Sequence, residues 1–467
     1  RRPRPRAAAA AEGAPALSGP GPPPRRLRLG MVGGGEGAFI GNVHRIAARL
    51  DDEWTLVAGA LSSDAGRARS SAAALRIDPD RSYTDFAEMA RREAARTREH
   101  GDGIDAVAIV TPNHLHAPVA HAFLEAGIDV ICDKPLALTL EEGRALADAA
   151  RARGRFFAVT YNYSGYPMVR RARALVQAGR LGTLRALQVE YAQDWLGTAL
   201  EATGQKQAAW RTDPALAGHA GCLGDIGTHA YQLACFVTGL TARSVSADLG
   251  RLVPGRQLDD HVQAMLRFGT DADTAAGDAG GVRGTLWASQ VASGAANGLR
   301  LRVHGDRASL EFDQQRPDEL WLRDQGGDEA RLRRGRTPAG ATETLRLPGG
   351  HPEGFLEAFA QLYRDAAVAI RSRQAGAPLP PEAADLSLID DGVAGLAFVA
   401  ATLRSAADGG RWPPIERRTW AAQEPGRGCG AAERQACRAG PRGIRTTTTR
   451  RPQRPTRRWV RPPPPSA

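Results

Sequence analysis

The stretch "RLRLGMVGGGEGAFIGNVHRIAARL", residues 26–50, decides the fold of the first half of this 467-residue chain. Apolar residues alternate before the glycines, as in a buried strand, and recur with helical spacing after them. Gly33, Gly35 and Ala38 fit the pattern G-x-G-x-x-A. In it the first residue permits a tight turn, the second lets the main chain approach a pyrophosphate, and the third lets helix and strand pack closely. Because the helix start favours an anion, the stretch predicts a dinucleotide-binding turn.

The residues that follow place this turn in a larger unit. A glycine-rich turn alone is a weak signal, but "WTLVAGAL" (54–61), "DAVAIVT" (105–111) and "DVICDKP" (129–135) indicate three more buried strands, with helical patterns between them. We therefore predict an α/β Rossmann domain with a doubly wound parallel sheet over residues 27–155. We expect its first turn to contact the cofactor through Gly33, Gly35, Glu36, Gly37, Ala38, Phe39 and Ile40.

The residues after the second strand bear on the choice of cofactor. A Rossmann fold usually places an acid there on the ribose 2′-hydroxyl, whereas this chain has "LSSDAGRARSS", with Ser62 and Ser63 before Arg67. Hydroxyls and a guanidinium bind a 2′-phosphate through charge-assisted hydrogen bonds. We therefore predict that NADP(H) is preferred and that NAD(H) is possible. In the alternative interpretation Asp64 serves the ribose, and the arginines form a solvated helix face.

Polar residues also follow the third and fourth strands, in "TPNHLH" and "CDKP". Because ligands of such sheets bind beyond the carboxyl ends of the strands, we expect these residues on the cofactor floor. The predicted set is Thr111, Pro112, Asn113, His116, Asp133, Lys134 and Pro135, with Asn162 from the following segment.

Lys134 is unusual because the chain has 62 basic residues but only two lysines, Lys134 and Lys206. A lysine after a strand is most often solvated. Where composition favours arginine, however, an ammonium can approach a hydroxyl oxygen and shift its pKa in a way that a bulky guanidinium does not. This rarity favours a role for Lys134 in the chemistry.

With these motifs the chain resembles the Gfo/Idh/MocA oxidoreductases, the family of glucose-fructose oxidoreductase and inositol dehydrogenase. The likeness lies in "GMVGGGEGAFIGNVH", "AIVTPNHLHAPVAHAFLEAGIDVICDKPLALT", "GRLGTLRAL" and "GDIGTHAYQLACFVTG", and extends over residues 27–410. The family motif usually reads E-K-P, whereas this chain has Asp133 in place of the glutamate, so the acidic side chain is one methylene shorter. The resemblance implies that Lys134 orients and polarises a substrate hydroxyl. It also implies a homo-oligomer.

The resemblance implies a second domain, α+β with an open, largely antiparallel sheet over the nicotinamide, which we place at residues 156–410. Alternating runs at 184–195, 261–268, 283–292 and 299–312 support strands there independently. Residues 324–350 are predicted as a loop, and helical patterns follow at 351–372 and 385–406.

"CLGDIGTHAYQL" brings together Asp225 and His229, four residues apart and hence on one face of a helix. A carboxylate beside an imidazole can fix its tautomer and raise its pKa, which suits a general acid or base. The family pattern implies that His229 exchanges the proton and that Asp225 contacts the imidazole or the substrate. Many members carry an acid where this chain has Gln232. A metal site of Asp225, His229 and His261 lacks further ligand spacing, so we predict no metal.

Aromatic and polar residues near the start of the second domain suit stacking on a sugar face and bonding to its hydroxyls. Aromatic residues in strands belong to the core as often as to a site. The predicted substrate contacts are Tyr163, Gln193, Asp194, Trp195, Lys206, Trp210 and Arg211.

The ends of the chain account for its basic character. The net charge is +11 overall, with +5 in residues 1–26 and +11 in 411–467, which leaves −5 for residues 27–410. Both ends are rich in Arg, Pro and Ala or Thr, so we predict disordered tails and no nucleic-acid partner. No signal peptide, membrane span or cysteine framework is recognisable, which favours the cytoplasm.

Together these patterns predict an enzyme that transfers a hydride between a nicotinamide and a secondary hydroxyl of a sugar, inositol or related cyclic polyol. Two alternatives stay open. One is a glycosidase-like relative that uses bound cofactor without net redox change. The other is a protein that binds NADP without chemistry.

Overall fold

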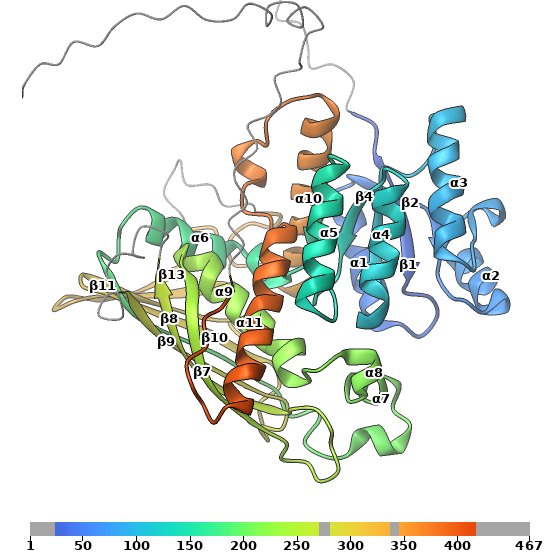
Figure 1. The fold of residues 1–467 in the computed structure, drawn as a ribbon. Helices are drawn as coiled ribbons and strands as arrows, with labels where there is room; N and C mark the ends of the chain where they lie inside the picture. Colours follow the sequence, from blue (N-terminus) through green and yellow to red (C-terminus); the bar gives the residue numbers. More distant parts are fainter. Residues whose placement is uncertain (1–23, 270–280, 337–344, 417–467) are drawn as a thin grey trace, which may run out of the picture. The chain divides into compact units, whose positions relative to one another are not determined.

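The computed structural model describes residues 24–269, 281–336 and 345–416. Its first sheet has five parallel strands in the order β2-β1-β3-β4-β5, drawn in blue to green in Figure 1. The strands are β1 (Leu27–Gly33), β2 (Trp54–Ala60), β3 (Ala106–Val110), β4 (Asp129–Cys132) and β5 (Phe157–Val159). Strand order reverses between β1 and β3, the switch point at which such sheets bind ligands. The predicted Rossmann fold is confirmed, but β5 lies beyond the predicted boundary at residue 155 because the sheet continues past it.

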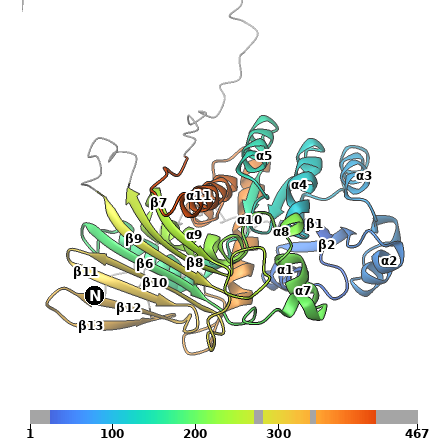
Figure 2. The ribbon, with the colours of Figure 1, turned by 60° about the horizontal axis from the view of Figure 1, so that its bottom comes forward.

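Helices cover both faces of this sheet. They are α1 (Phe39–Leu50), α2 (Ala65–Ala74), α3 (Phe86–Glu99), α4 (His116–Glu125) and α5 (Leu140–Ala152), with α10 (Phe355–Gln374) from much later in the chain. Figure 2 shows α3, α4 and α5 in a row on one face and α1 on the other, where it packs against α10.

Helix α10 therefore belongs to the first layer although it follows the second sheet in sequence. Phe359 and Tyr363 share a buried apolar cluster with Met31 and Val43 of the β1–α1 unit. The Trp54 indole N–H donates to the main-chain oxygen of Tyr363 at 2.9 Å. Sequence order hid this contact, because the helix pattern at 351–372 shows an apolar face but not its partner.

The second sheet has eight strands in the order β13-β12-β11-β10-β6-β9-β8-β7, antiparallel except between β6 and β9. The strands are β6 (Leu184–Ala192), β7 (Thr241–Gly250), β8 (His261–Gly269), β9 (Val282–Ser289), β10 (Gly298–Gly305), β11 (Ala308–Asp313), β12 (Glu319–Asp324) and β13 (Glu329–Arg333). This confirms the open, largely antiparallel sheet.

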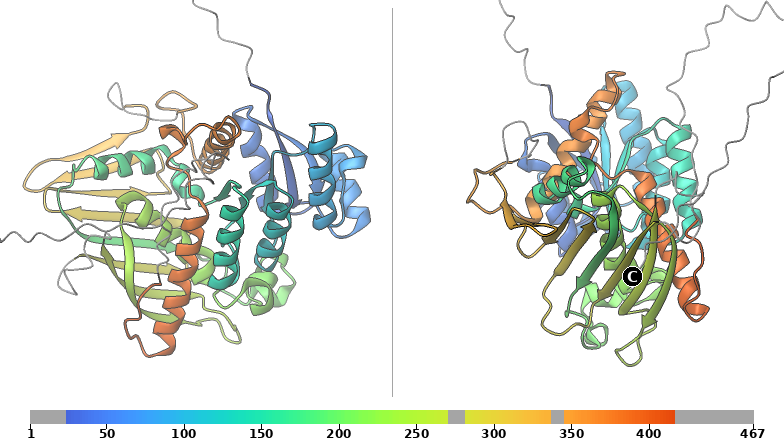
Figure 3. Two further views of the ribbon diagram at one scale, coloured as in Figure 1. Left: turned by 45° about the horizontal axis from the view of Figure 1, so that its top comes forward. Right: turned by 90° about the vertical axis from the view of Figure 1, so that its left-hand side faces the viewer.

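One face of the second sheet packs against α6 (Pro167–Gln177), α9 (Thr228–Thr238) and α11 (Ile389–Ala407). Helix α11, red in Figure 3, contacts β7 on one side and α5 on the other, so it joins the two layers. Two short helices, α7 (Lys206–Arg211) and α8 (Pro214–Ala217), follow β6.

Strand β13 lies inside the segment 324–350, so the prediction of a loop there was wrong in part. β13 pairs with β12 at the edge of the sheet. Most of its side chains are exposed, and it therefore lacks the apolar alternation that reveals a half-buried strand.

The folded unit extends slightly past both boundaries predicted from composition. Arg25 pairs with Asp105 at 2.7 Å, and Ile415 is buried next to a bridge between Pro414 and Ser244. The rest of both predicted tails, residues 1–23 and 417–467, lies outside the described residues.

Candidate active site

A cavity of about 740 Å³ is lined by residues from both sheets. One wall consists of the β1–α1 turn and the ends of β3 and β4, and the other consists of β6, α7, the start of α9 and the residue before β10. The cavity therefore lies at the switch point where a dinucleotide is expected.

The glycines of the β1–α1 turn are required by its backbone conformation and by its close packing against neighbouring segments. Gly33 has φ +80°, and a Cβ on Gly35 would lie 2.6 Å from the main-chain oxygen of Leu61. The closest helix–turn approach involves Gly41, where a Cβ would lie 2.3 Å from the Cα of Gly34. Gly41 thus has the close-packing role that the sequence pattern assigned to Ala38.

We expect Gly41→Ala to weaken cofactor binding and lower stability, because the added methyl must push α1 away from the turn. The loss of stability should be about 1–3 kcal/mol. Thermal unfolding with and without cofactor measures both effects. Wild-type stability together with wild-type affinity would contradict this account of the turn.

Most residues predicted to contact the cofactor line the cavity. They are Gly33, Gly35, Glu36, Ala38, Phe39, Ile40, Ser62, Arg67, Thr111, Pro112, Asn113, Asp133, Lys134 and Asn162. The hydroxyl of Thr111 and the amide nitrogen of Asn162 are buried and have no hydrogen-bond partner among the described residues. These atoms and the glycine turn fit a dinucleotide that supplies the missing partners.

Four residues predicted for this set are outside the cavity wall, namely Gly37, Ser63, His116 and Pro135. His116 is buried, and its Nδ1 and Nε2 lie 2.6 and 3.0 Å from the main-chain oxygens of Pro135 and Thr111. The motif predicted that His116 contacts the cofactor. Instead, its imidazole connects the loop after β3, at Thr111, with the loop after β4, at Pro135. Asp64, the alternative ribose ligand, caps α2 by accepting the Arg67 main-chain N–H at 2.7 Å.

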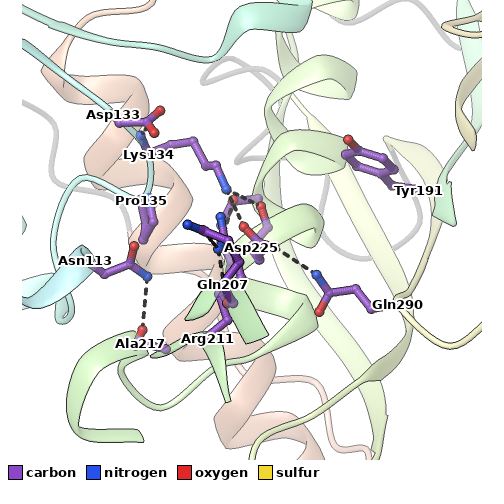
Figure 4. A network of polar contacts seen from close by, with 12 residues as sticks. Asn113, Asp133, Lys134, Pro135, Tyr191, Gln207, Arg211, Ala217, Asp225 and Gln290 are labelled. Atoms are coloured by element: carbon purple, nitrogen blue, oxygen red, sulfur yellow. Dashed lines mark hydrogen bonds and ion pairs between the residues drawn. The ribbon is translucent and has the colours of Figure 1, made fainter. Parts of the chain in front are cut away.

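Lys134 points from the end of β4 toward Asp225, as Figure 4 shows. Its Nζ donates to the Asp225 carboxylate Oδ1 and to the Asp225 main-chain oxygen, each at 2.7 Å. Asp133 turns the other way: its Oδ1 accepts the Lys134 main-chain N–H at 2.9 Å and the Thr160 hydroxyl at 2.8 Å. The shorter acid of this chain therefore holds the loop while Lys134 reaches into the cavity.

Asp225 is ionised in this setting. Burial alone would raise its pKa, but the charges of Lys134 and Arg211 hold the pKa well below its usual range. Its Oδ2 accepts from the Gln290 side chain at 2.8 Å and lies 3.4 Å from the Arg211 Nε. Asp225 is thus a partly buried anion among two cations and one amide donor.

His229 lines the cavity near Asp225, yet no hydrogen bond joins the two among the described residues. Its Nδ1 is buried without a partner in that part of the chain. The rings of Tyr161, Tyr163 and Tyr191 surround it edge-on, with centroids 4.9 to 6.3 Å away.

Asp225 raises the pKa of His229, as predicted, but the net shift is downward. Burial lowers the pKa of His229 well below its usual value, the charge of Lys134 lowers it further, and Asp225 opposes them only in part. Burial is the largest of these effects, and Asp225 makes no hydrogen bond to the imidazole among the described residues that would offset it. The imidazole is therefore neutral at pH 7 and has one nitrogen free to accept a proton.

Among the predicted substrate contacts, Tyr163, Gln193, Trp195, Lys206, Trp210 and Arg211 line the cavity. Asp194 does not, because its Oδ2 accepts the Gly294 main-chain N–H at 3.1 Å and so caps a loop. Gln232 is also turned away, since its side chain donates to the Ser387 hydroxyl at 2.9 Å.

A hydrogen-bond network near the end of β6 and the start of β10 lines part of the cavity. The Asn297 carbonyl oxygen accepts from the Tyr191 hydroxyl at 2.8 Å and from the Gln193 amide at 2.7 Å. Gln193 in turn accepts the Trp195 indole N–H at 3.0 Å, and Asn297 donates to Gln314 at 3.1 Å.

Sequence reasoning missed Tyr191, Asn297 and Gln314 of this network, and also Gln290. Tyr191 lies two residues before Gln193, so strand alternation alone could have placed it on the same face. Asn297 reaches the site only because Gly298 pairs with Ala192 of β6, a register that no local pattern reveals.

In the ranges that the structure describes, no group of three or more His, Cys, Asp and Glu side chains could hold a metal ion. The same residues contain no helix both long and apolar enough to cross a membrane.

Two family profiles match successive parts of the chain. Residues 27–161 match an oxidoreductase family with an NAD-binding Rossmann fold, and residues 169–311 match the GFO/IDH/MocA C-terminal domain. A Bacillus subtilis protein, the uncharacterized oxidoreductase YfiI, is 33% identical over 83% of this chain and 96% of its own length. Levoglucosan dehydrogenase from Pseudarthrobacter phenanthrenivorans is 31% identical over 63% of this chain and 76% of its own length.

Solved structures agree with these matches. An oxidoreductase from Sinorhizobium meliloti is 45% identical, with a TM-score of 0.72, over 84% of this chain and all of its own. An inositol dehydrogenase homologue from Azotobacter vinelandii, complexed with NAD+, is 36% identical, with a TM-score of 0.76, over 84% of this chain and 97% of its own. The fold, the switch-point cavity and these likenesses agree: the chain belongs to the Gfo/Idh/MocA family of NAD-binding oxidoreductases.

Proposed function

We propose that the protein transfers a hydride between a nicotinamide cofactor and the carbon of a secondary hydroxyl in a sugar, inositol or related cyclic polyol. The observation that carries this proposal is that Lys134, Asp225 and His229 line the same cavity as the glycine turn. A bound nicotinamide would supply the hydride acceptor or donor.

Lys134 is the group we assign to the substrate oxygen. Two of the three ammonium hydrogens are directed at Asp225, which leaves one for a ligand. An ammonium held in this way is ready to stabilise the negative charge that develops on the oxygen as the hydroxyl proton leaves or, in the reverse direction, as the hydride arrives at the carbonyl carbon.

His229 is the group we assign to the proton. Its low pKa keeps the imidazole neutral, so in the oxidation direction it can take the hydroxyl proton as the carbonyl forms. In the reverse direction the imidazolium returns this proton to the alkoxide. Asp225 compensates the charge on the imidazolium, because it is an anion nearby.

The network around Asn297 favours a substrate with many hydroxyl groups. The Asn297 side-chain oxygen already accepts two donors of this network, whereas the Gln193 side-chain oxygen accepts only the Trp195 indole N–H and keeps a lone pair for the cavity. A polyol supplies hydroxyl donors for such a wall. Relatives named for levoglucosan and for scyllo-inositol support this substrate class.

We infer that NADP(H) is the preferred cofactor, with NAD(H) also accepted. Ser62 and Arg67 line the cavity next to the turn, and the nearby carboxylate of Asp64 is engaged as a helix cap. One relative is an NADP+-dependent scyllo-inositol dehydrogenase, whereas solved relatives contain NAD+ or NADH. The preference therefore depends on residues that differ within the family.

We expect Arg67→Ala to lower the affinity for NADPH roughly ten- to hundredfold, the equivalent of a hydrogen bond to a charged group, and to leave NADH affinity nearly unchanged. Fluorescence titration with both cofactors measures this. Arg69→Ala is the control, since Arg69 is on the same helix but outside the cavity wall. An equal loss for both cofactors would exclude a 2′-phosphate contact.

The test of the function is turnover of a polyol and ketose panel, followed by nicotinamide absorbance. Net formation or consumption of reduced cofactor supports the proposal. Cleavage of a glycoside without net cofactor change would instead favour the glycosidase-like alternative. Tight NADPH binding without turnover of any panel member would favour the binding protein.

Two further expectations complete the proposal. We infer a homo-oligomer and a cytoplasmic location, the first from the family resemblance and the second from the composition. Size-exclusion chromatography with light scattering tests the first expectation.

A further inference from the structure

Asp225 belongs to a π-helical turn, η5 (Leu223–Gly227), directly before α9. Helix starts leave main-chain N–H groups without partners. Here a single residue, Asp259, takes three of them. Its carboxylate oxygens accept the N–H groups of Gly221 and Leu223, both at 2.7 Å, and its main-chain oxygen accepts that of Cys222 at 2.8 Å.

This contact between Asp259 and the turn is tight. A Cβ on Gly221 would lie only 2.3 Å from the Asp259 main-chain oxygen, so only glycine permits the approach. Asp259 is buried, and neither it nor Gly221 lines the cavity. Asp259 therefore acts on the main chain that carries Asp225 and does not touch the ligand space.

Gln290 holds the other part of Asp225, its carboxylate. Its side-chain amide donates to Oδ2 at 2.8 Å, as Figure 4 shows, while Lys134 binds Oδ1. Gln290 is 2% exposed, and its main chain is held on both sides. Its main-chain N–H donates to the main-chain oxygen of Asp260 at 3.0 Å, and its main-chain oxygen accepts the Leu196 N–H at 3.1 Å.

Asp259 and Gln290 come from the same end of one pair of strands. His261, at the start of β8, lies opposite Ser289, at the end of β9. Asp259, two residues before His261, and Gln290, one residue after Ser289, therefore reach the turn from neighbouring strands. The end of the β8–β9 ladder thus forms a rigid support for a single side chain in the cavity.

We propose that Asp259 and Gln290 are positioning residues for the reaction, with Asp259 fixing the main chain of the turn and Gln290 fixing the carboxylate orientation of Asp225. Only in that orientation does Oδ1 face Lys134 and hold its ammonium toward the substrate. This inference rests on the proposed function, because it assumes that Lys134 and Asp225 serve turnover.

The first test is Gln290→Met, which keeps the length of the side chain but removes the donor. We expect kcat to fall roughly ten- to hundredfold, as small misplacements of catalytic groups do, with cofactor Kd unchanged. Gln290→Asn retains the amide on a shorter chain and should recover part of kcat. Asp259→Asn, which keeps one acceptor oxygen, should act in the same direction.

The decisive test is a double-mutant cycle with Asp225→Ala. If Asp259 and Gln290 act through Asp225, their substitutions cost little further turnover once that carboxylate is gone. Additive losses in kcat, or a loss of cofactor affinity, would overturn the proposal. Asp85→Asn is the control, since Asp85 caps α3 by accepting a main-chain N–H far from the cavity.

The cycle separates this inference from the proposed function. If Asp225→Ala retains wild-type turnover, the proposed site itself is wrong. If Asp225→Ala is impaired and the other substitutions remain additive, only the positioning role is wrong. Should Asp259→Asn fail to fold, the double-mutant cycle of Gln290→Met with Asp225→Ala decides the test. Gln290→Met is expected to fold because it introduces no charge and preserves volume.

Discussion

Replacing Lys134 by Met is expected to reduce kcat/KM for polyol oxidation roughly a thousandfold while the cofactor dissociation constant stays near that of the wild type. The size follows from removing the donor that meets the developing charge on the substrate oxygen, for which losses of about 10² to 10³ are typical. Cofactor affinity should persist because the glycine turn is unchanged. Steady-state kinetics and a fluorescence titration measure the two quantities separately.

Lys134→Arg is the matched control for this prediction. Arginine retains the charge that pairs with Asp225, so the variant should fold with nearly wild-type thermal stability. Its guanidinium is broader and more weakly hydrated than an ammonium and cannot approach a single oxygen in the same way. We therefore expect Lys134→Arg to have a melting temperature near that of the wild type but to remain as impaired in turnover as Lys134→Met. Wild-type turnover in both variants would reject the assignment of Lys134.

The sequence predicted the half of the site that depends on local patterns. The glycine turn, the strand-end residue Lys134 and the D-x-x-x-H spacing are each encoded within a few neighbouring residues, and all three lie on one cavity. A parallel sheet brings the ends of its strands to one edge, so the relation between these residues followed from the strand pattern alone.

The other half depends on contacts between distant segments. Gln290 and Asp259 act on Asp225 through the register of β8 and β9, and Asn297 meets Gln193 through the register of β10 and β6. Strand alternation tells which face a residue occupies, but not which residue of another strand lies opposite. These residues were therefore beyond what the sequence pattern could show.

Of the two expected contacts of Asp225, the imidazole and the substrate, the first is absent among the described residues, for an electrostatic reason. Spacing places Asp225 near His229, but a partly buried carboxylate binds the donors with the best geometry. Here these are the Lys134 ammonium and the Gln290 amide. The imidazole is left among three tyrosine rings, where burial determines its pKa. This difference leads to a measurable pH dependence.

In alcohol oxidation, kcat/KM should stay constant as the pH falls from 8 and should decline only at a midpoint below the ordinary histidine value of about 6.5. The pH profile of kcat/KM reports the pKa values of ionisable groups in the free enzyme. In the free enzyme, burial lowers the pKa of His229. A histidine whose pKa was raised by Asp225 would lose activity above pH 6.5 instead. A midpoint above that value would contradict the environment described for His229.

Replacing His229 by Gln is expected to lower kcat/KM roughly 10²- to 10⁴-fold, the usual contribution of a positioned proton acceptor, and to remove the acidic decline. Stability provides an independent check. A group whose pKa is lower in the folded state than in the unfolded state costs stability as the pH falls below the unfolded value, because the unfolded chain then binds the proton more strongly. The melting temperature of His229→Gln should therefore fall less between pH 7 and pH 5 than that of the wild type. An equal fall in both proteins would show that His229 takes up its proton as readily in the folded cavity as in the unfolded chain, and it could then not be the neutral base that the reaction requires.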